Sequence, residues 1–169
     1  MKKIFFLAVS TLISIAALSQ SKSSGYSSAS LGLEVGMPMG DFKETHSIGL
    51  GASVHGLFGV KSGFTTSIGY MTFTGKDVNF GGLGTIKLPA FNMIPVKIGY
   101  RVATEGGFYF EPQIGITFTS SNGSSSSAFT YAPTIGATAG AMDVSVRYEG
   151  LSKDNSTLNF LGLRLAFKF

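Results

Sequence analysis

The sequence has 169 residues and no cysteine, so we expect no disulfide, no thiol chemistry and no lipid anchor on a cysteine. Charged residues make up only 13% of the chain, against about 25% in a typical soluble domain. The formal net charge is +4 without any basic cluster, and we therefore expect no nucleic-acid partner.

The chain begins with a pattern typical of a secretory signal peptide. Two lysines follow Met1, an apolar stretch runs from Ile4 to Leu18, and the small residues Ala17 and Ser19 fit a cleavage site. The apolar stretch has about 15 residues, whereas a membrane-spanning helix needs about 20. We expect a cleaved signal peptide at residues 1–19, a short polar segment at 20–27 and a β-barrel domain at 28–169.

After residue 28, large apolar residues alternate with small or polar ones, which is the pattern of a β-strand with two unlike faces. This alternation predicts eight strands, near residues 29–37, 48–59, 63–73, 94–101, 108–118, 128–140, 142–149 and 161–169. Most of them are about ten residues long, as a tilted strand needs to be to cross a bilayer.

The expected connections alternate in length. Short ones fall at 59–62, 103–107 and 139–141, and longer ones at 38–47, 74–89, 120–127 and 150–156. Outer-membrane barrels have short periplasmic turns and longer external loops. We expect the same asymmetry here, with both termini in the periplasm and the Ser-rich tract 120–127 as a flexible loop.

The composition of the two faces favours a membrane barrel over a soluble sandwich or a soluble exported lipid-binding barrel. The polar faces consist mostly of Gly, Ala, Ser and Thr, whereas a solvated surface is rich in charges. Small residues with a few charges suit the interior of an eight-stranded barrel, which side chains just fill. We predict an all-β, closed, antiparallel transmembrane β-barrel of about eight strands with up-and-down topology.

Aromatic residues collect at the ends of the expected strands, where the interfacial girdles of membrane barrels lie. They are Phe58, Phe64, Tyr100, Phe108, Phe118, Phe129, Tyr131, Tyr148, Phe167 and Phe169.

Charged residues on the small-residue faces are expected to form a structural hydrogen-bonded network in the lumen, because unpaired charges there are costly. They are Glu34, Lys97, Arg101, Glu111, Arg147, Glu149, Arg164 and Lys168. A hairpin centred near Thr104 predicts that Lys97 faces Glu111. Across the closing seam, Glu34 is expected to face Arg164 or Lys168. A proton or ion path through this network is the alternative interpretation.

Four segments, "IPVKIGYR", "GFYFEPQIGI", "VSVRYEGLS" and "LGLRLAFKF", resemble the outer-membrane protein β-barrel domain family, a broad group of small porin-like barrels. The resemblance covers most of the chain after residue 28. It implies a barrel in the outer membrane, with membrane lipids and the barrel-assembly machinery as partners, but no single activity. In that family the alternating apolar end of the chain, here Leu163, Leu165, Phe167 and Phe169, is the assembly signal.

Candidates for chemistry are few. Asp41, Glu44 and His46 lie within one expected loop and offer an acid–His pair or three metal donors. No nucleophile motif accompanies them, and His55 has the parity of a hydrogen-bonded lumen residue. We therefore expect no catalytic, metal-binding or cofactor-binding residues.

The sequence thus predicts a non-enzymatic outer-membrane barrel with a filled lumen and exposed loops for structural, adhesive or ligand-contact roles. Three alternatives stay open: a narrow channel for small or hydrophobic solutes, an outer-membrane hydrolase or acyltransferase, and a soluble exported lipid-binding barrel.

Overall fold

The computed structural model describes residues 27–79, 85–154 and 156–169. The expected signal peptide and residues 20–26 of the polar segment lie outside these ranges. The described elements, in chain order, are β1 (Ser27–Met39), α2 (Phe42–Thr45), β2 (His46–Phe58), β3 (Gly63–Gly75), β4 (Asp77–Asn79), β5 (Thr85–Lys87), β6 (Phe91–Ala103), β7 (Phe108–Ser121), β8 (Ser124–Ala139), β9 (Met142–Lys153) and β10 (Ser156–Lys168).

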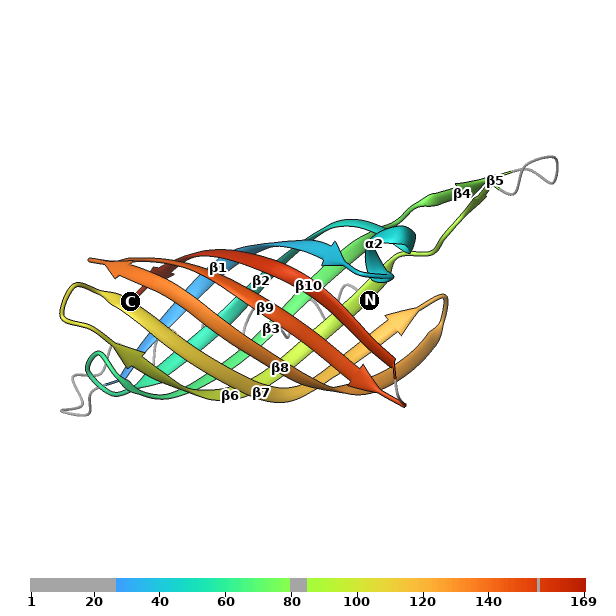
Figure 1. The fold of residues 1–169 in the computed structure, drawn as a ribbon. Helices are drawn as coiled ribbons and strands as arrows, with labels where there is room; N and C mark the ends of the chain where they lie inside the picture. The colour runs from blue at the N-terminus through green and yellow to red at the C-terminus, as the bar shows by residue number, and fades with distance from the viewer. Residues whose placement is uncertain (1–26, 80–84, 155) are drawn as a thin grey trace, which may run out of the picture.

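Eight of these strands form a closed barrel in the order β1-β10-β9-β8-β7-β6-β3-β2 (Figure 1). All neighbouring strands are antiparallel, and β1 closes the barrel by pairing with β10. The predicted fold class and all eight predicted strands are confirmed. Among the described residues, the longest helix is α2, and none has the length and hydropathy needed to cross a membrane.

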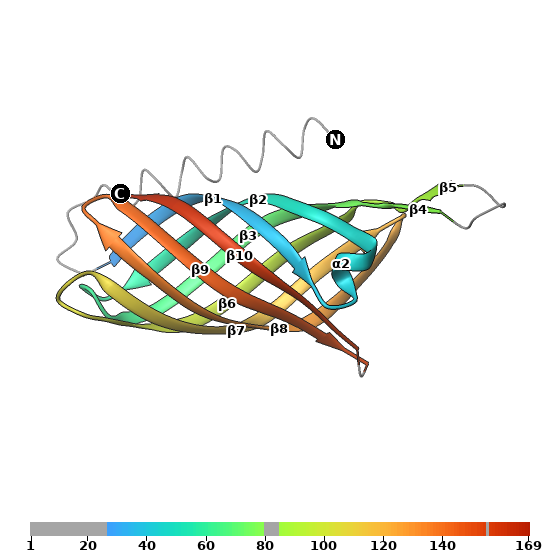
Figure 2. The ribbon, with the colours of Figure 1, turned by 45° about the horizontal axis from the view of Figure 1, so that its top comes forward.

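The barrel has two unlike ends (Figures 1 and 2). We call the end with Ser27 and Lys168 the terminal end, because β1 begins there and β10 ends there. The opposite end, the loop end, carries α2 between β1 and β2. It also carries the small hairpin of β4 and β5, which projects beyond the barrel.

Two of the expected long loops are instead tight turns between strands that extend further than predicted. β7 extends to Ser121 and β8 starts at Ser124, so the Ser-rich tract is the tip of a hairpin rather than a flexible loop. The turn between them is Asn122-Gly123, with φ angles of 48° and 79°. Asn-Gly favours this left-handed two-residue hairpin turn.

The hairpin of β9 and β10 shortens the other expected loop in the same way, because β9 extends to Lys153 and β10 begins at Ser156. The expected long connections remain only where the chain passes through α2 and through β4 and β5.

The outer face of the barrel is apolar, as the alternation predicts. Leu33, Ile98 and Ile135 are more than 60% exposed, and so much exposed apolar surface is typical of a barrel surrounded by lipid. Eight of the ten aromatic residues expected in the girdles are exposed; the other two, Tyr131 and Tyr148, are half-buried with ring centroids 6.4 Å apart.

Candidate functional site

Nine ionisable side chains inside the barrel form one unbroken series of contacts in which acidic and basic groups alternate. Eight contacts with N–O distances of 2.5 to 3.8 Å join them. Every member is at most 7% exposed. We call this series the charge chain; in order it is Lys97, Glu149, Arg147, Glu34, Arg164, Asp143, Arg101, Glu111 and His55.

The charge chain crosses the lumen instead of following one wall. Lys97 on β6 donates to Glu149 on β9 over 2.7 Å, although two strands separate β6 from β9 in the barrel. Arg147 on β9 donates to Glu34 on β1 over 2.6 Å, past the intervening β10. These contacts connect strands that are not neighbours in the barrel and so resist its deformation.

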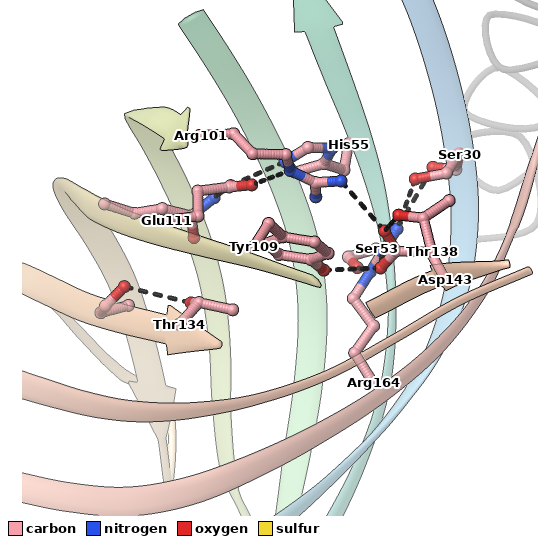
Figure 3. Close-up of polar contacts among 12 residues, drawn as sticks. Ser30, Ser53, His55, Arg101, Tyr109, Glu111, Thr134, Thr138, Asp143 and Arg164 are labelled. Atoms are coloured by element: carbon pink, nitrogen blue, oxygen red, sulfur yellow. Dashed lines mark hydrogen bonds and ion pairs between the residues drawn. The ribbon is translucent and has the colours of Figure 1, made fainter. Parts of the chain in front are cut away.

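Asp143 and Tyr109 organise the terminal end of the charge chain (Figure 3). The Asp143 carboxylate accepts hydrogen bonds from Arg101 at 3.1 Å, from the Tyr109 hydroxyl at 2.8 Å and from Thr138 at 3.1 Å. The Arg101 guanidinium also lies 3.6 Å from the centroid of the Tyr109 ring, in cation–π geometry. The Arg101 side chain is therefore held by packing as well as by charge.

Glu111 is the corresponding acceptor on β7. It accepts hydrogen bonds from Arg101 at 2.6 Å and Gln113 at 2.6 Å, and it contacts the His55 ring nitrogen at 2.8 Å. A buried carboxylate needs several such partners, because its loss of hydration must be replaced by hydrogen bonds. The expected lumen position and hydrogen bond of His55 are confirmed.

The charge chain is balanced and leaves little empty space. Four carboxylates pair with four Lys and Arg side chains, so the negative and positive charges of these groups balance. The cavity left among these side chains has a volume of about 30 Å³, enough for one or two waters at most.

The loop-end half of the lumen is filled by a buried cluster that we call the apolar plug. Its members are at most 3% exposed and are Phe42, Met71, Phe73, Met93, Leu151 and Phe160. The ring of Phe73 meets Phe42 and Phe160 edge to face, with centroids 5.0 and 5.2 Å apart. Because Phe42 belongs to α2, the short helix inserts its buried side chain into the barrel mouth.

Glycines on β1 and β2, the next two strands around the barrel from β3, make room for the plug. A Cβ atom added at Gly36 would lie 2.8 Å from the Phe73 ring, and one added at Gly49 would lie 2.5 Å from it. Real Cβ atoms do not approach other atoms that closely, so these positions on β1 and β2 accept only glycine while the Phe73 ring stays in place.

The predicted pairing of Lys97 with Glu111 is wrong. The β6–β7 hairpin turns between Thr104 and Phe108, and its strand register sets Lys97 opposite Gly115. The predicted centre at Thr104 lies two residues too early, because the chain reverses through Gly107, whose φ is +85°. Glu111 therefore meets Arg101, at 2.6 Å, instead of Lys97.

Seven of the eight lumen residues named from the sequence lie in the charge chain. Lys168 does not: it is half-buried at the terminal end, and none of the ion pairs found among the described residues involves it. Asp143 belongs to the chain although the sequence-based network omitted it. It has the same parity on β9 as Arg147 and Glu149, and this signal was sufficient to identify it.

The loop candidates for chemistry do not converge. His46 contacts the Thr45 hydroxyl at 2.8 Å and packs against Phe42, while Asp41 and Glu44 are exposed. Among the described residues, no three His, Asp or Glu side chains are arranged to hold a metal ion.

Comparison with known proteins identifies the fold. No family model and no curated protein matches the sequence. Among solved structures, the N-terminal β-barrel domain of Pseudomonas aeruginosa OprF matches with a TM-score of 0.63 at 11% identity, over 86% of this chain and all of that one. The attachment invasion locus protein Ail of Yersinia pestis, in complex with the heparin analogue sucrose octasulfate, matches with 0.58 at 13% identity, over 87% of this chain and all of Ail.

Neisserial surface protein A matches with a TM-score of 0.53 at 11% identity, over 87% of this chain and 97% of that one. At these identities the matches establish a shared fold, that of the small eight-stranded transmembrane β-barrels.

Proposed function

We propose that this chain is a non-enzymatic integral protein of the outer membrane. Its sealed barrel serves as an anchor, and its loop end makes contacts outside the cell. The observation that carries the proposal is a lumen blocked between its two mouths by the charge chain and the apolar plug, inside a lipid-facing exterior. A structure of this kind holds a surface in place and offers no path for solutes.

The closed lumen argues against the alternative of a narrow channel. An ion entering from the terminal end meets side chains already paired with one another, and the remaining cavity of about 30 Å³ is water-sized. Further along the axis it meets the plug, whose members are at most 3% exposed. Conduction would require both regions to rearrange together.

The charge of the loop end bears on which contacts it makes. Its described cations are Lys43, Lys76, Lys87 and Lys153, and its described acids are Asp41, Glu44, Asp77 and Asp154. The two sets are equal in number, so this rim offers no positive excess for a polyanion such as the heparin analogue bound by Ail. We assign the contact role to the projecting hairpin of β4 and β5, whose outer edges pair with no other described strand and could take up a partner strand.

A membrane fractionation and conductance experiment tests this proposal. The mature protein should start near Gln20, fractionate with the outer membrane and migrate differently on gels before and after boiling. Purified barrels should give no stable conductance in planar bilayers. Recovery from the soluble periplasm, or steady single-channel currents, would contradict it.

Trypsin added to intact cells tests the orientation. Lys76 precedes β4 and Lys87 ends β5, so both should be cleaved, while Lys61 and Lys168 at the terminal end should stay protected. The reverse cleavage pattern would place the terminal end outside.

Recognition of the chain end by the barrel-assembly machinery is part of the proposal. Phe169 is half-exposed, and its backbone pairs with Ala29 across the seam. Deleting Phe169 should cost about 1–3 kcal/mol of stability from lost burial. If Phe169 is an assembly signal, its deletion should reduce insertion in cells far more than refolding in detergent. Equal, small defects would make it an ordinary interfacial residue.

A further inference from the structure

The apolar plug is covered on one side only. α2 contacts β1, β2 and β10, and its Phe42 seals that part of the mouth. Phe91, Ala128 and Leu158 also pack against the plug but are only partly buried, and the Phe91 ring marks the border with α2 because its centroid lies 5.4 Å from that of Phe42. Their outer surfaces form an apolar floor that no described part of the chain covers.

A pocket of about 330 Å³ lies over this floor. Phe91, Ala128, Leu151 and Leu158 form its apolar base, and Ser126 and Lys153 stand on its polar rim. The lining side chains come from β6 to β10 and have the same parity as the neighbouring lumen residues. The pocket therefore opens inside the barrel mouth, away from the lipid-facing surface.

The rim carries one cation over the apolar base. The Lys153 ammonium donates a hydrogen bond to the Ser126 hydroxyl, which holds it on the rim. Its acidic neighbour Asp154 is 4.0 Å away with a side chain 87% exposed, whereas that of Lys153 is 51% exposed. Asp154 also lines the pocket, but it is the better hydrated of the two, whereas Lys153 is held on the rim by Ser126.

We propose that this pocket binds a small amphiphile with a flat apolar body and an anionic head. The volume is at the lower end of the range for small-molecule sites, which combine an apolar lining with a few polar groups. The body would cover the uncovered base of the plug, and the head would accept a hydrogen bond from Lys153. This site goes beyond the proposed anchoring role and is independent of the β4–β5 hairpin.

Titration with 2-naphthoate tests the proposal. The probe is water-soluble and combines an aromatic body with a carboxylate. With the full-length mature barrel in lipid nanodiscs, amide NMR signals of Ser126, Leu151 and Leu158 should shift saturably. Shifts confined to residues on the lipid-facing surface would mean partition into the bilayer and would overturn the proposal, as would the absence of any saturable shift.

Two variants and a matched control separate the base from the rim. Ala128→Leu fills the base without adding charge and should abolish saturable binding. Lys153→Gln should weaken binding about tenfold or more, the loss expected for one charged hydrogen bond, whereas Lys43→Gln, at an exposed lysine on α2, should change nothing. Unchanged binding in Ala128→Leu overturns the site.

The head group is tested with the probe itself. 2-Naphthalenemethanol, which has the same rings and no charge, should bind the unmodified barrel more weakly than 2-naphthoate. Equal affinities for the two probes would overturn the anionic head.

Discussion

The terminal-end half of the lumen is filled by the charge chain and the loop-end half by the apolar plug, although the same barrel strands line both. In the plug, each side chain contributes area and shape, and a smaller side chain leaves a cavity. In the charge chain, each side chain allows its neighbours to be buried by pairing with their charges, because an unpaired buried charge is far more costly than a cavity. The two halves should therefore respond differently to the loss of one member.

The largest effect is expected at Glu149, which is fully buried and holds both Lys97 and Arg147. Glu149→Ala leaves two cations without this partner and should cost about 3–5 kcal/mol. Urea unfolding in lipid vesicles measures the loss. The exposed turn residue Glu105 provides the control, and Glu105→Ala should stay within about 0.5 kcal/mol of the unmodified protein. A loss below about 1 kcal/mol for Glu149→Ala would mean that the chain relaxes or admits water.

The exterior provides a third environment to compare with the two halves. Val146 faces outward, and Val146→Arg should cost about 2–4 kcal/mol near the bilayer midplane. Its neighbour Ser145 faces the lumen, where Ser145→Asn should be milder if the side chain finds a partner. The same unfolding assay checks both, and equal penalties would show that the two faces are assigned incorrectly.

Removing the buried side chain of α2 from the plug should lower the stability of the barrel by a smaller amount. Phe42→Ala removes one buried ring from a four-residue helix at the barrel mouth, where the space can collapse or admit water. The loss should therefore stay near the transfer term of about 2 kcal/mol, below the value for a closed core cavity. The expected loss is below that for Glu149→Ala because no charge is left unpaired. A loss as large as that of Glu149→Ala would mean that α2 holds more of the mouth than its one buried residue.

The smallest expected quantity is the coupling between the halves. Phe42 and Asp143 lie at opposite ends of the lumen without a shared contact, so Phe42→Ala and Asp143→Asn should be additive within about 0.5 kcal/mol. Glu149→Ala and Lys97→Ala should couple by about 1–3 kcal/mol, since the second change removes a charge that the first left unpaired. Double-mutant cycles measure both values, and strong coupling of the distant pair would make the lumen one cooperative unit.

Strand number and facing were predictable because parity is a local property. Leu163 and Arg164 are neighbours in sequence, and the structure places Leu163 outside and Arg164 inside. The turns were less predictable where composition outweighed local chemistry. The Ser-rich tract suggested a loop, whereas its Asn122-Gly123 pair alone indicates a tight hairpin.

Contacts across the lumen were not predictable, because they depend on how far each strand is shifted relative to its neighbours. An error of two residues at the β6–β7 turn was enough to assign Glu111 to Lys97 instead of Arg101. The partner of Lys97 lies on β9, across the barrel, and no local pattern indicates it. One member of the plug was predictable from parity, because Phe160 shares the parity of Arg164 on β10 and therefore faces inward.

The pairing of β1 with β10 also determines when the barrel can form. Ser30, in the first strand of the barrel, pairs with Lys168, in its last strand. Until that final strand arrives, every shorter intermediate has two strand edges whose backbone groups lack partners, which lipid does not tolerate. Because this closing contact joins residues so distant in sequence, it is also among the slowest to form. Insertion should therefore wait until all eight barrel strands are present, and until then they must stay unfolded and protected from aggregation.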